Sequence, residues 1–306
     1  MRLLRFDDGG VPRLGVLKGD GIVVLHGESP TYPTMLSIVA GGAEALGRIE
    51  THVAQVQPRL ALAGTRLLAP IERPGKYLAI GMNYRKHLEE AERIGVPAPE
   101  QQLWFNKQTT CLSGPFDDIE PGVTEQLDYE CELGVVIGRP AKGVREADAR
   151  DHVFGYFVAN DVSARDWQFH SPTFTMGKSF DTHGPIGPWI VTADEVTDPH
   201  ALKLRCLVNG KVRQASDTSQ MIFSLWQQIA YLSTAFTLES GDLIATGTPE
   251  GVGVGMQPPV FLRRGDVVRC EIDGVGAIEN RVAASPALAR IAEHMGGLVN
   301  ARVEGV

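Results

Sequence analysis

Segment 127–137, LDYECELGVVI, constrains the fold more than any other part of the chain. Polar and apolar residues alternate at its start and β-branched residues fill its end, a pattern typical of a buried β-strand. Because successive side chains of a strand point to opposite faces, Glu130 and Glu132 share one face. The other face carries Leu127, Tyr129, Cys131 and Leu133. Two neighbouring carboxylates indicate either a divalent-metal site or, more simply, a solvated strand face.

The composition bounds the class of protein. The 306 residues, 43% hydrophobic and 22% charged, suffice for a sizeable globular core in one large domain, alone or with a small one. A net charge of −8 argues against general affinity for nucleic acid or an anionic membrane. No apolar run is long enough to span a bilayer, and the start lacks a signal-peptide pattern. The cysteines, at 111, 131, 206 and 270, form no CxxC pair, so we expect reduced thiols in a cytoplasmic protein.

Residues 1–70 are predicted to form a small N-terminal α/β domain. Glycine-containing turns separate three strands, and two helices follow. The strands are expected at 2–6, 13–18 and 22–25, and the helices at 34–39 and 43–57. Prolines at 58, 70 and 74 indicate a boundary near 65–76, which leaves 71–306 as the second domain.

Strands dominate the second domain, and its few helices do not alternate regularly with them. This excludes a doubly wound parallel sheet and predicts a β-rich α+β fold. Helices are expected at 84–94, 145–152, 163–168 and 219–236, with a short one after Ser285. Strands are expected at 76–80, 103–106, 127–137, 154–159, 189–192, 202–209, 243–245, 261–263, 267–272 and 276–282.

One helix carries a candidate general base. Asn83 is expected to cap the helix at 84–94, on which His87 and Glu90 lie three residues apart and therefore side by side. A carboxylate next to an imidazole fixes its tautomer, an arrangement common for a general base. The alternative is an ordinary exposed, charge-rich helix. Residues 95–118, which follow, are compatible with a segment over a site or with a surface loop, and the strand at 103–106 would carry Lys107.

Two further candidates lie near strand ends or in loops. Asp161 ends the strand predicted at 154–159 and would add a third oxygen to the glutamate pair. Mg²⁺ takes roughly six oxygens, so three carboxylates leave open positions. Lys178, in a loop at 176–185, could pair with a substrate carboxylate or be a surface lysine, and His183 of this loop is a weaker candidate.

The glycine-rich stretch 246–255 lacks the Gly-Lys-Ser/Thr of a phosphate-binding loop. Its glycines would let the backbone approach a ligand, and its threonine hydroxyls could hydrogen-bond to one. The alternative is a tight turn between strands.

Over about residues 76–283 the chain resembles the fumarylacetoacetate hydrolase family. The resemblance rests on five segments in a fixed order: GMNYRKH at 81–87, DYECELG at 128–134, NDVSARDWQ at 160–168, GKSFD at 177–181 and TGTPEGVG at 246–253. Each segment alone is weak, whereas all five in this order are specific.

The resemblance implies a mixed β-sheet roll around a metal site, usually in homodimers, with the small N-terminal domain of the longer members. Its metal ligands would be Glu130, Glu132 and Asp161, holding Mg²⁺ or Mn²⁺, with Ca²⁺ as an occupant that a crystal could contain. Its catalytic residues would be His87 and Glu90, on a lid-like helix, and Lys178. Its substrate contacts would include Gln168, Asp181 and either Thr246 or Thr248.

The activity implied is Mg²⁺-dependent hydrolysis of a C–C bond in a β-diketo acid, such as an acylpyruvate or a 2,4-diketo-3-deoxy sugar acid. His87, held by Glu90, would activate water, and Lys178 would stabilise the oxyanion or the substrate carboxylate. The same site would also serve decarboxylation of oxaloacetate, isomerisation of a hydroxymuconate-type acid or dehydration of a sugar acid, so fold and ligands do not choose among them.

Two non-enzymatic alternatives stay open. One is a protein that only binds a metal or a 2-oxo acid, and the other is a purely structural metal site. A base next to the metal counts against the first, and open coordination positions count against the second. For the enzyme, the expected partner is a small 2-oxo or diketo acid, with no nucleic acid and no membrane.

Overall fold

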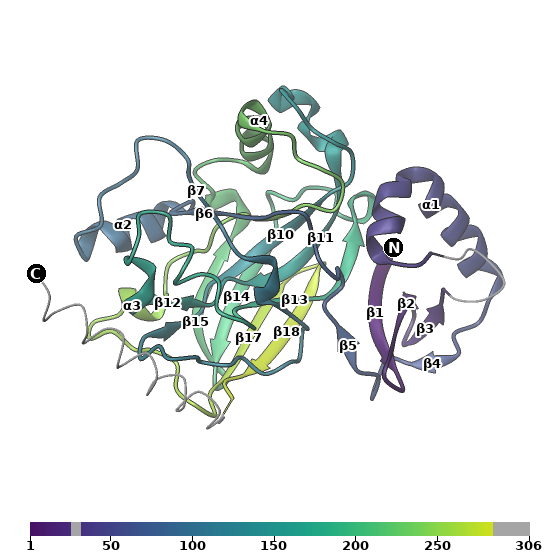
Figure 1. Cartoon of the computed structure of the whole chain (residues 1–306), viewed down its shortest axis with the longest axis horizontal. Helices are drawn as coiled ribbons and strands as arrows, with labels where there is room; N and C mark the ends of the chain where they lie inside the picture. Colours follow the sequence, from purple (N-terminus) through teal and green to yellow (C-terminus); the bar gives the residue numbers. More distant parts are fainter. Residues whose placement is uncertain (26–31, 284–306) are drawn as a thin grey trace, which may run out of the picture.

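Most strands belong to one mixed sheet of twelve strands (Figure 1). The computed structural model describes residues 1–25 and 32–283, so the helix expected after Ser285 lies outside the described residues. The strand order is β4-β3-β2-β1-β13-β11-β10-β16-β6-β7, with β5 beside β1 and β8 beside β13. The β-rich α+β class predicted from the sequence is confirmed.

The N-terminal module contributes one end of this sheet. Its strands are β1 (Arg2–Asp8), β2 (Val11–Lys18), β3 (Gly21–Val24), β4 (Leu60–Ala61) and β5 (Leu67–Leu68). The two helices expected here form one element, α1 (Met35–Gln55), which is kinked at Gly42, where φ is 52°. Strand β1 also pairs with β13 (Gly184–Thr192), through Arg2 opposite Val191 and Leu3 opposite Ile190. The module is therefore joined to the rest of the molecule by a continuous sheet.

The middle of the sheet positions the candidate site. Strand β10 (Cys131–Ile137) is buried along its whole length and lies between β11 (Val153–Asn160) and β16 (Leu243–Ala245). The far end of the sheet is formed by β6 (Tyr77–Gly81) and β7 (Leu103–Asn106). The strand predicted at 127–137 is interrupted: β9 (Leu127–Asp128) pairs with β12 (Ser163–Ala164) instead, and β8 (Leu112–Ser113) runs beside β13.

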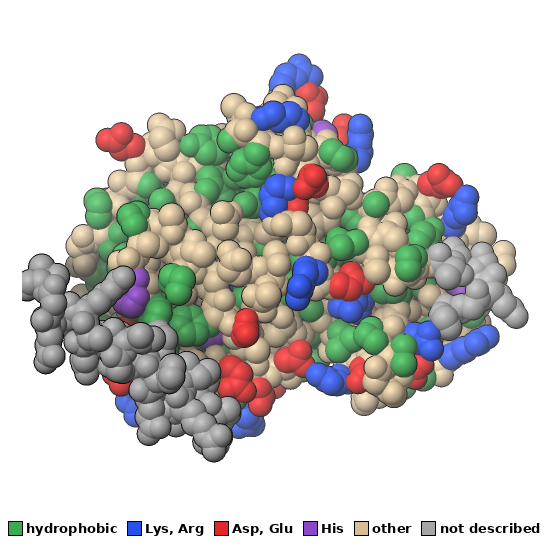
Figure 2. Space-filling model, in the orientation of Figure 1, with side chains coloured by type: hydrophobic (Ala, Val, Ile, Leu, Met, Phe, Trp, Pro, Cys, Tyr) green, Lys and Arg blue, Asp and Glu red, His purple; other side chains and the backbone are tan. Residues whose placement is uncertain are grey.

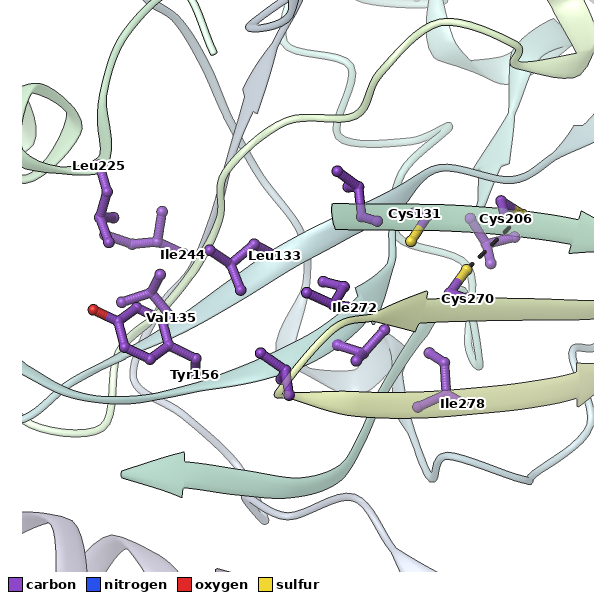
Figure 3. Packing of buried hydrophobic residues seen from close by; sticks show 14 of the residues in the cluster. Cys131, Leu133, Val135, Tyr156, Cys206, Leu225, Ile244, Cys270, Ile272 and Ile278 are labelled. Carbon is purple, nitrogen blue, oxygen red and sulfur yellow. Dashed lines mark hydrogen bonds between the residues drawn. The ribbon is translucent and has the colours of Figure 1, made fainter. Parts of the chain in front are cut away.

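A second sheet of four antiparallel strands covers one face of the first. Its order is β15-β14-β17-β18, formed by β14 (Lys203–Val208), β15 (Lys211–Asp217), β17 (Val267–Ile272) and β18 (Gly276–Arg281). Figure 3 shows Cys131 and Leu133 of β10 in the core with Cys270 and Ile272 of β17. The alternation predicted for β10 thus holds, since its odd-numbered side chains face this core. The strand expected at 261–263 is a loop.

Outside the N-terminal module, the helices of the described residues are short. They are α2 (Arg85–Arg93), α3 (Arg165–Gln168) and α4 (Leu225–Ala235), with the 3₁₀ turns η1 (Thr109–Cys111), η2 (Glu146–His152), η3 (Ala193–Glu195), η4 (Thr218–Gln220) and η5 (Gly253–Gly255). Helix α4 begins later than expected because Ser224 caps it, with Gln227 completing a capping box. The described residues contain no helix long and apolar enough to cross a membrane. On the face drawn in Figure 2, acidic and basic side chains are interspersed.

Candidate metal and catalytic site

The three predicted metal ligands meet where β10 begins and β11 ends. Glu130 directly precedes β10, Glu132 lies on it, and Asp161 directly follows β11. The antiparallel pairing of Cys131 with Asn160 brings these ends together, and the Asp161 amide donates to the Glu130 carbonyl at 2.9 Å. One carboxylate oxygen from each residue lies within 4.8 Å of the other two, and all three side chains are buried. Such a group of hard oxygen donors suits a divalent cation.

Three buried cations surround this group. Lys178 Nζ lies 2.8 Å from a Glu130 oxygen and 2.9 Å from an Asp161 oxygen. Lys107 Nζ contacts the other Asp161 oxygen. Arg165 lies 2.7 Å from Glu130 and 2.9 Å from the buried carboxylate of Asp128. These contacts fix the positions of the Glu130 and Asp161 carboxylates.

The charges within this cluster do not balance. Burial alone would raise the pKa of Glu130, but Lys178 and Arg165 outweigh it and lower that pKa to about 2. Glu132 has no cation at ion-pair distance in the described part of the chain, and one of its oxygens accepts from the Gly247 amide at 2.8 Å. Burial, and then repulsion by Asp161 and Glu130, raises the pKa of Glu132 well above its usual range. The residues therefore fit a divalent cation, which would remove this repulsion.

The His–Glu pair lies on α2, next to the acidic group. His87 Nδ1 is 3.0 Å from a Glu90 oxygen, and Glu90 also accepts from the Gly251 amide at 3.1 Å. The prediction that Asn83 caps α2 is wrong: Tyr84 is the N-cap residue, and the buried Asn83 side chain donates to the carbonyls of Phe223 and Thr246 instead.

One cavity unites the two groups. Its polar lining comprises His87, Glu90, Glu130, Glu132, Arg165, Gln168, Lys178 and Thr248, and its apolar wall includes Ile80, Leu103, Phe105, Phe174, Val252 and Val254. About 80 Å³ is open to the centres of water molecules, which is room for several waters or a small organic acid. The base pair thus faces the same small space as Glu130 and Glu132, whereas Asp161 lies outside the cavity lining.

The remaining predicted residues divide into two groups. Gln168 and Thr248 line the cavity: Gln168 accepts from Arg165 at 3.0 Å, and the Thr248 hydroxyl donates to the Cys131 carbonyl at 3.0 Å. Thr246 donates to the Leu133 carbonyl at 2.9 Å and lies outside the cavity lining. Asp181 is exposed and also lies outside it. His183 is buried elsewhere, with its Nε2 3.0 Å from the Glu120 carbonyl.

Three polar residues of this region received no role in the sequence analysis. Asp128 and Arg165 connect Glu130 to the glycine-rich stretch, because Asp128 also accepts from the amides of Gly253 and Val254 at 2.7 and 3.0 Å. Both lie inside the quoted segments, and that position was their only signal. The sequence signal for Lys107 was weaker, because it is only a lysine that directly follows an apolar strand.

Known proteins are similar to this chain in both fold and sequence. Residues 76–283 match the family described as fumarylacetoacetate (FAA) hydrolase, C-terminal, and residues 1–70 match the one described as Rv2993c-like, N-terminal. The chain belongs to the fumarylacetoacetate hydrolase family. Within it, the chain carries the Rv2993c-like N-terminal module, and the acidic group marks it as a metal-site enzyme of this superfamily.

The relatives differ in the reactions named for them. The mitochondrial oxaloacetate tautomerase fahd2 of Xenopus laevis is 45% identical over 290 residues, which cover 92% of this chain and 90% of the relative. The maleylpyruvate hydrolase of Sphingobium sp. SYK-6, solved with manganese(II) and pyruvate, is 33% identical with a TM-score of 0.77, covering 92% and 99% of the two chains. A 5-carboxymethyl-2-hydroxymuconate delta-isomerase of Mycobacterium smegmatis is 35% identical with a TM-score of 0.72 and the same coverage.

Proposed function

We propose that the protein is a divalent-metal-dependent tautomerase that interconverts the keto and enol forms of a 2-oxo acid of the oxaloacetate type. The observation that carries the proposal is one small cavity in which a His–Glu pair faces Glu130 and Glu132 of the buried three-carboxylate group. The 45% identity to an oxaloacetate tautomerase supports this choice among the reactions such a cavity could serve. We take Mg²⁺ as the preferred cation, with Mn²⁺ as the alternative.

Tautomerisation moves one proton. The C3–H bond breaks, its electron pair forms the C2=C3 double bond, and the former carbonyl oxygen takes a proton. A divalent cation held by Glu130, Glu132 and Asp161 supplies Lewis-acid polarisation of the 2-oxo group when bound. His87 exchanges the C3 proton through Nε2, because Glu90 engages its Nδ1.

Lys178 has a separate part in the proposed reaction. Burial alone would lower its pKa, but Asp161 and Glu130 raise it above the usual value, so the side chain stays an ammonium. Because it lines the cavity, it can donate a hydrogen bond to the substrate oxygen on which charge develops.

C–C hydrolysis of an acylpyruvate-type acid is the second candidate. It is favoured by the apolar wall formed by Leu103, Phe105 and Phe174, which would suit an acyl chain, and by the likeness to a maleylpyruvate hydrolase. The two reactions differ in products, since hydrolysis releases pyruvate and tautomerisation releases nothing.

The test follows the enol absorbance of oxaloacetate with the Mg²⁺-loaded protein and assays pyruvate from both oxaloacetate and acylpyruvates. We expect faster enol loss without matching pyruvate release. His87→Asn should lower the rate roughly 10²–10⁴-fold, whereas His170→Asn, an exposed histidine outside the cavity lining, should leave it unchanged. Pyruvate release from an acylpyruvate, with enol loss at the uncatalysed rate, would replace this proposal with the hydrolase.

A further inference from the structure

The glycine-rich stretch that follows β16 contacts the base pair directly. Helix α2 buries only Glu90 and Ala91, so its attachment to the body of the protein depends on few side chains. Glu90 accepts from the Gly251 amide at 3.1 and 3.3 Å through its two oxygens. A Cβ atom added to Gly255 would lie no more than 2.5 Å from Cγ, Cδ and Oε1 of Glu90. The carboxylate therefore occupies the space that a side chain at position 255 would fill.

This stretch is held firmly from the other side. The Tyr129 hydroxyl donates to the Gly251 carbonyl at 2.9 Å, and Asp128 accepts from the Gly253 and Val254 amides. Arg165 in turn joins Asp128 to the metal-ligand residue Glu130. Glu90 thus contacts a backbone segment that is connected to the acidic group through Asp128 and Arg165. If Glu90 were displaced, the glycine-rich stretch would stay in place and the contact would be lost.

Gly251 and Gly255 require a glycine for different reasons. Gly251 has a φ of +99°, a conformation that L side chains rarely adopt. Gly255 is not among the residues with positive φ, so alanine fits its backbone conformation. The three atoms nearest to the added Cβ all belong to the flexible Glu90 side chain. An alanine there would consequently move Glu90 rather than unfold the loop.

We propose that Gly255 is a positioning residue: the absence of a side chain at 255 seats the Glu90 carboxylate against Gly251, and the seated carboxylate orients His87 toward the cavity. The inference rests on the proposed function for its kinetic consequence and on geometry alone for the orientation of His87. Gly255 itself lies in the cavity lining but brings no side chain or ligand atom to it, so in this scheme it acts on the reaction only through Glu90.

The first experiment compares Gly255→Ala with the wild type in the full chain. We expect a thermal midpoint and a Mg²⁺ affinity close to those of the wild type, a kcat lower by roughly 10²-fold and a KM changed little, because only the orientation of the base is lost. The matched control is Gly47→Ala on α1, where an added Cβ meets nothing within 4 Å. A kcat of Gly255→Ala within about threefold of the control would overturn the proposal.

The second experiment restores the space. Glu90→Asp shortens the side chain by one methylene, so Gly255→Ala and Glu90→Asp together should retain at least tenfold more activity than the product of the two single effects predicts. Purely multiplicative effects would overturn the proposal. So would a Gly255→Ala chain that melts far below the wild type and is not restored by Glu90→Asp, since Gly255 would then be a folding requirement.

The third readout needs no turnover. In ¹⁵N-labelled wild type we expect one fixed His87 tautomer with the proton on Nδ1, and in Gly255→Ala an exchanging mixture of the two tautomers. An unchanged His87 spectrum would contradict the proposal. Because this measurement does not depend on catalysis, failure of the tautomerase assay in the wild type leaves it decisive for Gly255.

Discussion

At the scale of single residues, the acidic group together with Asp128 has one carboxylate more than the buried cations around it. Four buried carboxylates, counting Asp128, meet Lys107, Arg165 and Lys178. Glu132 is the member without an ion-pair partner in the described chain, so repulsion falls mainly on it. The molecule gives up some stability at Glu132 in exchange for a place where a cation binds.

This imbalance leads to a prediction for Glu132→Gln. The metal-free variant should be at least as stable as the wild type, because one of the repelling charges is gone. It should lose the stabilisation that Mg²⁺ gives the wild type, which is about 2.7 kcal/mol in the free energy of unfolding at a hundredfold excess over Kd and appears as a rise in thermal midpoint. Thermal unfolding with Mg²⁺ and with a chelator measures both effects, and Glu50→Gln, at an exposed position, is the control. A full Mg²⁺ shift in Glu132→Gln would contradict the assigned ligand set.

A second titratable residue affects stability away from the cavity. Burial, and then Lys107, lowers the pKa of His183 from 6.5 to about 3, so the folded protein keeps this imidazole neutral. The unfolded chain binds a proton near 6.5, and the folded state is therefore destabilised as pH falls from 6.5 toward 3. The largest slope for one such group is about 1.4 kcal/mol per pH unit.

Replacing His183 by glutamine should remove this pH dependence, because the amide keeps a donor for the Glu120 carbonyl but does not titrate. Urea unfolding at about pH 7 and about pH 5 measures the change, with His170→Gln as the exposed control. Equal losses of stability on acidification in His183→Gln and in the wild type would show that other groups cause the acid sensitivity.

Residues that lie in the quoted sequence segments could be predicted, and those that act across the chain could not. Glu130, Glu132 and Asp161 were named from alternation and a strand end, and the structure brings them together. Asp181 lies in a quoted segment and is nevertheless exposed. Lys107 meets Asp161 across 54 positions, a contact that depends on how β7 and β11 are arranged in the sheet and that no local pattern encodes.

At the scale of elements, Asn83 joins three segments at the start of α2. Its side chain donates to the carbonyls of Phe223 and Thr246 at 3.1 and 2.8 Å and accepts from the Phe223 amide at 2.8 Å. The side chain is fully buried. Local rules place an asparagine before a helix as a cap, but these long-range partners take precedence here.

Asn83→Ala should therefore cost more than the loss of a cap, which is typically about 1 kcal/mol. The buried Thr246 carbonyl and the partly buried Phe223 amide would each lose a partner, at about 1–3 kcal/mol for each group left unsatisfied, whereas the Phe223 carbonyl keeps the Gln228 side chain as a donor. Chemical denaturation measures the loss, and Ser224→Ala, which removes the cap of α4, gives the comparison within the same protein. A smaller loss in Asn83→Ala than in Ser224→Ala would mean that water replaces these bonds.

Other elements show the same limit of local patterns. The strand at 127–137 was predicted as continuous, but β9 leaves it to pair with β12, and this break frees Glu130 to face the cavity. Residues 261–263 were predicted as a strand, but they form a loop in which the Leu262 amide donates to the carbonyl of Leu127 in β9 without building a ladder. Hydrophobic periodicity indicates what a segment can form, whereas the available neighbours decide what it does form.

At the scale of the whole molecule, the N-terminal module is part of the main sheet. Strand β1 covers the edge of β13, and Leu3, Leu4 and Phe6 of β1 are fully buried. A boundary near 65–76 was predicted from prolines alone, and sequence spacing gives no information on pairing between β1 and β13. The homodimer that the family resemblance implies stays a prediction.

Deleting residues 1–70 should expose the edge of β13 and the apolar side chains that β1 covers, so the remaining chain should aggregate or unfold at a much lower temperature. Light scattering and thermal unfolding measure the outcome. The control is Val11→Asp, at an exposed position at the start of β2, which leaves the pairing of β1 with β13 intact. A soluble truncated chain with the wild-type midpoint would show that the module is dispensable for folding.

Strand β10 also bears on how such a chain can diverge. Cys131, Leu133 and Val135 contribute only apolar packing to the core. They can therefore be replaced by apolar residues of similar size, together with compensating substitutions in the second sheet. On the opposite side, a Cβ on Gly134 would overlap the ring of Phe157. This position can therefore change only if Phe157 is replaced by a smaller residue at the same time. Gly134 should therefore tolerate fewer single substitutions than Cys131, Leu133 or Val135, although it lies outside the cavity lining.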